Sequence, residues 1–271
     1  MHNIIAKNAN DFYEQGIQLL KDKGKKLQIR GSEVIELIGV NIEILNPRDR
    51  VITEVNRKFP LKGAMAEFLW YMTCNNRVEI IIPYLKHWIN FSDDGVYVNS
   101  NYGYQWQGQI ENVIKKLKSD RYTRQAVVTL FDKKYSSYTG KDTVCTPNFQ
   151  FFIREDRLHL IVSSRSRDLI RGECIDQFTF TCLQELVANE LGIELGTYQN
   201  CIGSLHIYSD HYDLLQSEMK FIDSETKDSK INMKYSDFWM EIDKTDKDDF
   251  IKKITETKNI DLEHFVKHRH V

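Results

Sequence analysis

A long, mostly apolar segment follows three short strand-like segments, and this order constrains the fold more than any other feature of the sequence. The segments RQAVVTLF, NFQFFIR and LHLIVSSR have the β-branched and aromatic composition typical of strands. The residues EDR between the last two predict a hairpin or another tight connection. The segment QFTFTCLQELVANELG predicts a helix that ends at Gly192. We therefore expect a central helix packed on a sheet.

The remaining pattern adds elements on both sides of this unit. Tyr13, Ile17 and Leu20 recur at helical spacing, and the segment LKGAMAEFLWYM predicts a second helix with Glu67 inside its apolar stretch. The segment CIGSLHIYSDHY predicts a strand that leads into a helix, and the charged tail from about residue 223 predicts solvated surface with amphipathic pieces. Neither a repeat nor a linker interrupts the chain, so we expect one domain over residues 1–271. A further strand is predicted from the alternation of Ile38, Val40, Ile42 and Ile44.

Composition narrows the class of protein. The 271 residues are 41% hydrophobic and 28% charged, which suits a globular α/β protein with a sizeable core. With 37 basic and 39 acidic residues, no global charge favours nucleic acid or a membrane surface. We find no signal segment or membrane-length apolar run, so we expect a soluble, cytoplasmic protein. The five cysteines lack zinc-type spacing, so free thiols and no metal are expected.

A lone cysteine in DTVCTPNF, Cys145, admits two interpretations. A cysteine beside a strand is most often a small buried apolar residue. A nucleophile would need activation, and the segment SSRSRDLIRG offers Arg165, Arg167 and Arg171 as donors for a phosphate and as charges that lower a thiol pKa. Such an Arg- and Ser-rich stretch is also typical of a solvated turn, so the local sequence leaves both interpretations open.

Six ordered blocks, between about residues 30 and 215, carry a family resemblance. They are AEFLW, VNSNYGYQW, TRQAVV, VCTPNFQFFIR, SRSRDLIRGECIDQ and GSLHIYSDH. In them the chain resembles the superfamily of thymidylate synthases and pyrimidine nucleotide hydroxymethylases, and within it the deoxycytidylate and cytidylate hydroxymethylases. The resemblance implies a thymidylate synthase-like α/β (α+β) fold with a large mixed sheet packed by helices. It also implies a homodimer formed through the sheet face, with residues 223–271 divergent.

The resemblance gives Cys145 a chemical role. Enzymes of this kind add a cysteine thiolate to C6 of a pyrimidine, so that C5 can attack the methylene of 5,10-methylenetetrahydrofolate. By resemblance, Arg165 lies near the thiol and contacts the substrate phosphate, to which Ser166 adds a hydroxyl donor. Arg124 matches an arginine that reaches the phosphate of the neighbouring subunit. Arg30, where the matching region begins, belongs to the same substrate-binding set.

Further positions match the sugar and the reacting ring. His206 and Tyr208 match the pair that binds the sugar 3′-hydroxyl, although two such residues on a strand are commonly a half-buried pair. By resemblance Glu67 is the buried acid that organises water and moves protons, which needs a raised or tunable pKa; otherwise it is an ordinary helix carboxylate near the surface. Tyr102 matches a catalytic position.

Two residues match the folate side of the site. Asp168 matches the carboxylate that contacts the pterin. Trp88 lies fourteen positions before Tyr102, the interval at which the family keeps a tryptophan over the cofactor, although a lone tryptophan is more often part of a core. The co-substrate expected from the resemblance is therefore 5,10-methylenetetrahydrofolate.

Asp176 bears on the choice of base. Thymidylate synthases carry asparagine here, whose amide suits the N3–H and O4 of uracil. A carboxyl group that accepts from N4 and shares a proton with N3 suits cytosine instead. Without the resemblance, Asp176 would be interpreted as the N-cap of the following helix.

Other departures agree with a hydroxymethylase. Thr146 replaces the usual histidine after the nucleophile, and GECIDQ replaces Gly-x-Pro-Phe-Asn. A separate departure is Gln125, which replaces the second of two arginines and predicts a weaker cross-subunit contact with the phosphate. The C-terminal EHFVKHRHV lacks the apolar tail that closes over folate in the synthases. We therefore predict folate-dependent 5-hydroxymethylation of CMP or dCMP. The alternatives are methylation of a pyrimidine monophosphate and a nucleotide-binding regulator without turnover.

Overall fold

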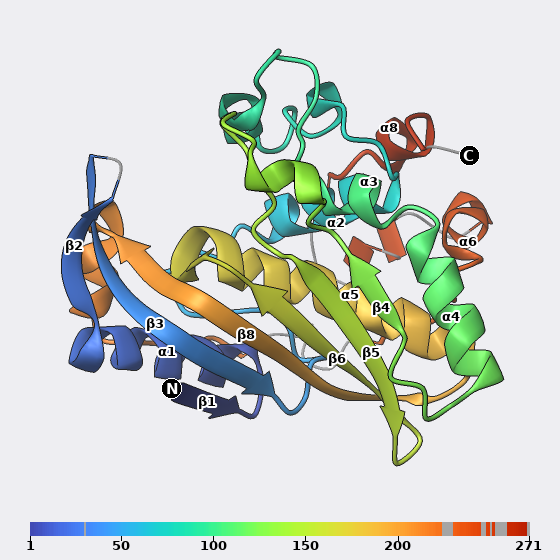
Figure 1. Ribbon diagram of the computed structural model, residues 1–271, viewed down its shortest axis with the longest axis horizontal. Coiled ribbons are helices and arrows are strands. Elements are labelled where there is room, and N and C mark those ends of the chain that lie inside the picture. Colours follow the sequence, from blue (N-terminus) through green and yellow to red (C-terminus); the bar gives the residue numbers. More distant parts are fainter. Residues whose placement is uncertain (30, 224–229, 245–247, 250, 253–258, 270–271) are drawn as a thin grey trace.

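A single mixed sheet organises the protein in the computed structural model (Figure 1). The structure describes residues 1–29, 31–223, 230–244, 248–249, 251–252 and 259–269. Eight strands form the sheet: β1 (His2–Ala6), β2 (Lys25–Ile29), β3 (Ser32–Ile44), β4 (Val127–Thr129), β5 (Asn148–Arg154), β6 (Arg157–Ser164), β7 (Arg167–Asp168) and β8 (Glu194–Tyr208). The spatial order is β1-β3-β8-β6-β5-β4, with β2 paired to β3 and β7 paired to β8. Strands β6 and β8, like β1 and β3, run parallel, and the pairs β3–β8, β5–β6 and β4–β5 are antiparallel.

Helices cover one face of this sheet. Figure 1 shows α5 (Cys174–Leu191) running behind β8, β6 and β5, whereas no described helix lies in front of these strands in that view. The other α-helices are α1 (Ala9–Lys23), α2 (Leu61–Met72), α3 (Tyr102–Trp106), α4 (Gln109–Ser119), α6 (Phe238–Lys244) and α8 (Leu262–Val266). Short 3₁₀ turns are η1 (Val78–Ile80), η2 (Lys86–Phe91), η3 (Lys133–Ser136) and η5 (Ser209–Leu215), and η4 (Leu169–Glu173) is a π-turn that leads into α5.

The predicted central helix is confirmed. Helix α5 is buried on nearly all sides, as expected for a helix without a polar face, and it ends at Gly192 in the left-handed conformation with φ 68°. Its ring of Phe180 lies 4.7 Å from that of Phe149 on β5. The buried Gln184 donates to the Leu158 carbonyl at 2.8 Å, so the polar side chains of α5 also tie it to the sheet.

The predicted hairpin is confirmed as well. Strands β5 and β6 are joined by Glu155 and Asp156 at φ 51° and 56°, the conformation of a two-residue turn that matches the twist of the flanking strands. Along β5, Phe149, Phe151 and Ile153 face the core while the residues between them face outward. This alternation fixes which side chains point toward α5.

Two expectations about packing need correction. The strand predicted over Ile38 to Ile44 begins at Ser32, and Ile38 is 74% exposed although Val40 is buried, because Gly39 at φ 71° interrupts the alternation. The tail was expected to be solvated surface with amphipathic pieces. Its described helices are short and amphipathic, but they bury Phe238 and Phe265 against the rest of the protein, because their few apolar residues lie on one side.

Candidate active site

Cys145 lies in the segment that leads into β5, beside the end of β6. Its side chain is half-buried, and the backbone amide of Arg165 donates to the Cys145 carbonyl at 2.9 Å. The exposed Arg165 side chain turns back over this segment: Nη2 lies 3.5 Å from the Cys145 sulfur and donates to the Thr143 carbonyl at 2.8 Å, and Nε donates to the Val144 carbonyl at 3.0 Å. The predicted neighbours Cys145 and Arg165 are therefore in contact.

The electrostatic balance at the thiol differs from the simple expectation. Burial raises the pKa of Cys145 above its ordinary value, and the positive charges of Arg167 and then Arg165 oppose that rise without cancelling it. The sequence pointed to Arg165 as the activating charge. Arg167 acts more strongly on the thiol.

Arg167 lies elsewhere in the site than its sequence pattern predicts. The segment SSRSRDLIRG predicts Arg167 as a phosphate donor together with Arg165 and Arg171, but a bend at residues 165–166 separates them. Arg165 is exposed beside Cys145, and Arg171 forms an exposed ion pair with Asp210. Arg167 is 3% exposed and turns inward. The two acidic residues that follow it at positions 173 and 176 were the available signal, since a buried guanidinium needs carboxylate partners.

Asp176 pairs with this buried arginine. Its Oδ2 lies 2.5 Å from Nη1 of Arg167, in the first turn of α5. Burial raises the pKa of Asp176, and the charge of Arg167 opposes that rise. Residue Glu173, not Asp176, occupies the N-cap position, and no side chain caps the helix. The capping interpretation of Asp176 is therefore wrong.

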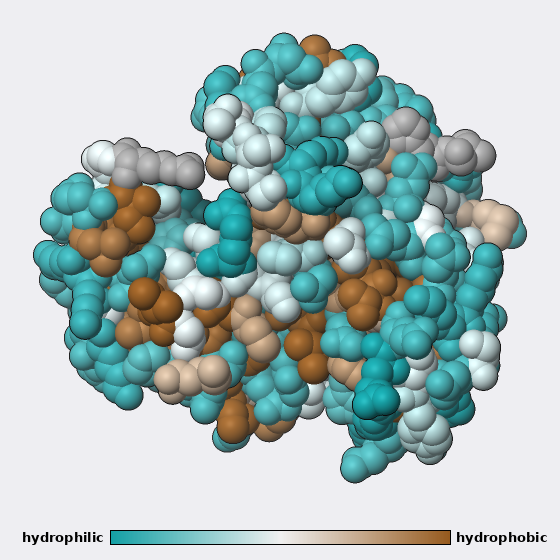
Figure 2. All heavy atoms as spheres, in the orientation of Figure 1, coloured by the Kyte–Doolittle hydropathy of each residue, from teal (hydrophilic) through white to brown (hydrophobic). Residues whose placement is uncertain are grey.

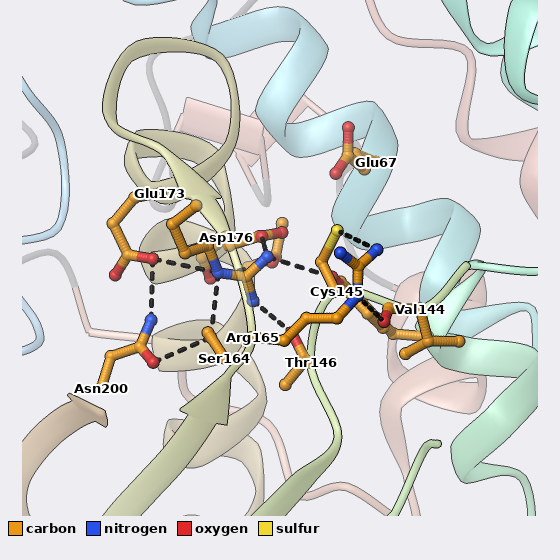
Figure 3. A network of polar contacts seen from close by, with 12 residues as sticks. Glu67, Val144, Cys145, Thr146, Ser164, Arg165, Glu173, Asp176 and Asn200 are labelled. Atoms are coloured by element: carbon orange, nitrogen blue, oxygen red, sulfur yellow. Dashed lines mark hydrogen bonds and ion pairs between the residues drawn. The ribbon is translucent and has the colours of Figure 1, made fainter. Parts of the chain in front are cut away.

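A hydrogen-bonded network holds Arg167 in place, and Figure 3 labels its members Ser164, Glu173 and Asn200. Nε of Arg167 donates to Ser164 Oγ at 3.0 Å and lies 3.2 Å from Glu173 Oε2. Asn200 on β8 closes the loop, because it accepts from Ser164 at 2.8 Å and donates to Glu173 at 2.8 Å. Burial raises the pKa of Glu173 to about 7. Thr146, beside Cys145, accepts a further hydrogen bond from Arg167.

Glu67 lies on α2 with its carboxylate buried. Tyr71, one turn later, donates to Oε1 at 2.7 Å, and the Trp88 indole donates to Oε2 at 3.3 Å. Burial, followed by the charge of Asp176, raises the pKa of Glu67 to about 8, while the two hydrogen bonds and Arg167 lower it. The raised pKa agrees with the expectation for a proton-transferring acid, and the surface interpretation of Glu67 is wrong, since only 4% of it is exposed.

Trp88 and Tyr102 line the same region. Trp88 is half-buried and packs edge-on against Trp70 at 5.2 Å between ring centroids, so it contacts both the core and Glu67. Tyr102 begins α3, and its hydroxyl accepts from Nη1 of Arg167 at 3.2 Å. Burial raises the pKa of Tyr102, which keeps its hydroxyl protonated as a hydrogen-bond donor.

Asp168, His206 and Tyr208 form a second group at the β7–β8 pair. Asp168 is the register partner of His206, and the rings of His206 and Tyr208 lie 5.3 Å apart in edge contact. Oδ1 of Asp168 caps η4 by accepting from the amides of Ile170 and Arg171. Among the described residues, Asp168 Oδ2 and His206 Nδ1 are buried without a hydrogen-bond partner. Such groups are costly unless a ligand satisfies them.

The remaining predicted residues lie at the periphery. Ser166 is half-buried between β6 and β7. Arg124 is exposed before β4, where its carbonyl accepts from Gln150 at 2.9 Å. Among the described residues, its side chain makes no hydrogen bond or ion pair with the cluster around Cys145. Arg30 lies outside the described residues.

Comparison with known proteins places this arrangement in a family. The family model described as thymidylate synthase matches residues 11–266. The chain belongs to the thymidylate synthase family. A thermostable thymidylate synthase A from Bacillus subtilis shares the fold at a TM-score of 0.65 and 23% identity, covering 77% of this chain and 83% of that one. The predicted fold class and superfamily are thus confirmed.

Curated relatives carry two kinds of name. The deoxyuridylate hydroxymethyltransferase of Bacillus phage SP01 is 30% identical over 78% of this chain and 60% of its own length, and that of Pseudomonas phage M6 is 30% identical over 78% and 62%. Thymidylate synthase 1 of Bacillus spizizenii is 26% identical over 68% of this chain and 70% of its own. The chain thus spans less than two thirds of the length of these hydroxymethyltransferases. No described helix is both long and apolar enough to cross a membrane.

Proposed function

We propose that this protein transfers a one-carbon unit to C5 of a pyrimidine nucleoside monophosphate, and that the reaction is folate-dependent 5-hydroxymethylation of CMP or dCMP. The observation that supports the cytosine base is the carboxylate of Asp176, held by Arg167 where thymidylate synthases carry an asparagine. Membership of the thymidylate synthase family supports the reaction class.

The proposed chemistry begins at Cys145. Its thiolate forms a bond to C6 of the base, and the electrons of the C5=C6 bond become available at C5 as an enamine-like nucleophile. Arg165 and Arg167 lower the free energy of the thiolate, which burial alone disfavours. A nucleotide phosphate drawn to the exposed Arg165 and to Ser166 would place the ring over the sulfur. Orientation of this kind accounts for much of the barrier reduction in such additions.

Glu67 is the proposed proton-transferring group. With a pKa of about 8 it is mostly protonated at neutral pH, and it can release and regain a proton within the working pH range. Tyr71 and Trp88 hold its two oxygens in place. Hydroxymethylation also needs a water molecule at the exocyclic carbon, and we propose that Glu67 orients it, with the Tyr102 hydroxyl as a neighbouring donor.

Folate fits the second side of the site. The co-substrate 5,10-methylenetetrahydrofolate would supply a one-carbon unit at the oxidation level of formaldehyde. Asp168 retains one buried oxygen without a partner among the described residues, which suits the N–H donors of a pterin. Trp88 offers a partly exposed ring beside Glu67. We propose that Asp168 and Trp88 bind the pterin, and that His206 and Tyr208 bind the sugar.

We also propose that residues 1–271 form one catalytic domain that works as a homodimer through the open sheet face. Figure 2, in the orientation of Figure 1, shows apolar atoms over this face, and Ile5, Ile38 and Val127 are among the exposed apolar residues of its strands. Exposed apolar surface of this kind is typical of an interface. In such a dimer Arg124 would reach the phosphate of the partner.

A second candidate is hydroxymethylation of dUMP. The names of the phage relatives at 30% identity favour it. Asp176 distinguishes the two candidate substrates. An ionised carboxylate accepts a hydrogen bond from the N4 amino group of cytosine, whereas it is repelled by O4 of uracil, which is also an acceptor. Methylation of the same nucleotides is the third outcome, as in the relatives named thymidylate synthase.

The test is incubation of the purified protein with methylenetetrahydrofolate and each of CMP, dCMP, UMP and dUMP. Mass spectrometry of the nucleotide and absorbance of dihydrofolate are recorded together. A hydroxymethylcytosine product without dihydrofolate is expected. A hydroxymethyluracil product would favour the second candidate, a methylated product with dihydrofolate the third, and binding without turnover a regulatory role.

A further inference from the structure

Arg167 is the most heavily engaged side chain in the interior of the site. Its side chain is 3% exposed, and its hydrogen bonds and ion pairs among the described residues are all with side-chain oxygens. Those oxygens come from the loop before β5, the end of β6, helix α3 and the start of α5. The partners are Asp176, Glu173, Ser164, Thr146 and Tyr102.

The contacts of Arg167 divide into a fixed side and a working side. On the fixed side, Nε is held by Ser164 and Glu173, which Asn200 links to each other (Figure 3). On the working side, Nη1 lies 2.5 Å from Asp176 Oδ2. Because the guanidinium is planar and its fork is rigid, the fixed side determines where the working side points.

The carboxylate of Asp176 has one oxygen engaged and one available. Oδ2 is occupied by Arg167, whereas Oδ1 has no hydrogen-bond partner among the described residues. Asp176 also acts electrostatically on both Glu67 and Cys145, which places its carboxylate within range of the reacting groups. The available oxygen is therefore the one that a bound base can meet.

We infer that Arg167 is a specificity-determining positioning residue, which holds Asp176 as an ionised, acceptor-only carboxylate and so makes the site select the amino edge of cytosine. This inference rests on the proposed function and extends it to a residue that does not itself touch the base. An ionised Asp176 accepts from N4–H of cytosine, whereas a protonated Asp176 could donate to O4 of uracil. The charge state of the buried Asp176 carboxyl group thus determines which base the site prefers to bind.

The effect of burial on a carboxyl group explains how Arg167 can control the charge of Asp176. A buried carboxyl group without a counter-charge becomes protonated, because burial disfavours the charged form. Burial does raise the pKa of Asp176, and among the described residues Arg167 is the charge that opposes this rise. Without Arg167, the pKa of Asp176 would lie higher still, so its carboxyl group would hold its proton to a higher pH. Discrimination between bases would then depend on pH.

The experiment measures that pH dependence by calorimetric binding of dCMP and dUMP to the full-length protein between pH 6 and 8.5. The quantity of interest is the ratio of the two dissociation constants, in which the ionisation of the shared phosphate cancels. The wild-type ratio is expected to stay flat. In Arg167→Met, preference for dCMP is expected to fall about tenfold or more at pH 6.5, since one pKa unit corresponds to a factor of ten, and to recover toward pH 8.5.

Two further variants separate charge from packing. Arg167→Lys keeps the positive charge and is expected to keep a flat ratio within about threefold of the wild type, so it also serves if the methionine variant does not fold. Arg167→Met combined with Asp176→Asn is expected to give a low, flat ratio. If Arg167 had a purely structural role, its loss would weaken the binding of both nucleotides equally. A ratio of dissociation constants in Arg167→Met that stays flat and equal to the wild-type ratio therefore overturns the inference. Loss of the preference for dCMP at every pH in Arg167→Lys overturns it as well.

The outcome for the proposed function is read separately, from the wild-type protein alone. A wild-type preference for dUMP contradicts the cytosine substrate whatever the variants do. A ratio that becomes pH-dependent only in Arg167→Met supports the control of Asp176 by Arg167 in either case.

Discussion

Nη2 of Arg165 lies 3.5 Å from the sulfur of Cys145, and the amide of Arg165 donates to the carbonyl of the same cysteine. Two further carbonyls of the cysteine's own segment, those of Thr143 and Val144, hold the guanidinium. The charge beside the sulfur is therefore fixed by the protein without help from a ligand. This preorganisation is what a thiol nucleophile in a partly buried position needs.

Replacing Cys145 by Ala is expected to abolish turnover, because the bond to C6 cannot form, while the nucleotide dissociation constant stays within about threefold of the wild type. Product formation is followed by mass spectrometry and binding by calorimetry. Cys74→Ala is the matched control, since Cys74 is a second partly buried free cysteine and, among the described residues, makes no hydrogen bond with the cluster around Cys145. Unchanged turnover in Cys145→Ala would contradict the covalent mechanism.

Glu67→Gln is expected to change how stability depends on pH. The pKa of Glu67 is raised to about 8 in the folded protein, so the folded state keeps a proton that the unfolded chain loses near pH 4.5. The stabilisation is complete below pH 4.5 and is lost as the pH rises through 8. Gln cannot ionise. Between pH 5 and pH 8.5, the free energy of unfolding of the variant is therefore expected to rise relative to that of the wild type by on the order of a few kcal/mol.

Urea unfolding at pH 5, 7 and 8.5 measures this difference for Glu67→Gln. Glu14→Gln, on the exposed side of α1, is the control and is expected to give the same difference at each pH. A difference for Glu67→Gln that does not vary with pH would mean that the carboxyl group titrates normally.

Asp176→Asn is expected to move the ratio of kcat/KM from cytosine toward uracil nucleotides by about 10- to 100-fold. An amide can accept from N3–H and donate to O4 of uracil. An ionised carboxylate has no hydrogen to donate to O4. Competition assays with mixed dCMP and dUMP measure the ratio directly. An unaltered ratio would remove Asp176 from base selection.

Arg50 and Arg77 allow a comparison of a buried and an exposed ion pair. Arg50 is buried against the fully buried Glu185, whereas Arg77 pairs with Glu79 at 2.7 Å on the surface. Arg50→Met is expected to cost about 3–5 kcal/mol of unfolding free energy. Of the described residues, it leaves the half-buried Arg48, at 2.9 Å, as the one cation paired with the buried carboxylate of Glu185. Arg77→Met is expected to cost less than about 1 kcal/mol. Equal losses in urea unfolding would contradict this assignment.

The elements that the sequence predicted are those in which local pattern and burial agree. Helix α5 has no separate polar face and ends in a glycine, so both its existence and its end were predictable. The β5–β6 hairpin has alternating apolar residues on both strands and a short polar turn. In such segments the local sequence already favours the observed helix or strand, and tertiary packing stabilises it further.

The site was predicted less completely, because its decisive contacts are between residues far apart in the chain. The proximity of Arg165 to Cys145 came from the family resemblance. The inward orientation of Arg167 depends on a bend at residues 165–166 and on Asn200 from β8, neither of which a local pattern specifies. The exposure of Ile38 likewise depends on the backbone conformation of Gly39. Charge partners across strands decide where an arginine points.

Arg124 gives a test of the proposed dimer. Its side chain is exposed before β4, and it is proposed to serve the active site of the partner. Arg124→Ala and Cys145→Ala are each expected to be nearly inactive alone. After mixing, unfolding and refolding together, heterodimers should contain one site with an intact Cys145 and an intact Arg124 from different subunits. Random pairing predicts recovery of about a quarter of the wild-type activity.

The control for this complementation is a mixture of Cys145→Ala with Arg165→Ala, two residues that contact each other within one chain. No heterodimer of that pair contains an intact site, so no activity should return. Recovery with the Arg124 pair alone would support a shared site. Size-exclusion chromatography shows whether the mixed variants form a dimer. If they do and mixing Arg124→Ala with Cys145→Ala restores no activity, Arg124 acts within its own subunit or not at all. Arg165 and Ser166 would then bind the phosphate without it.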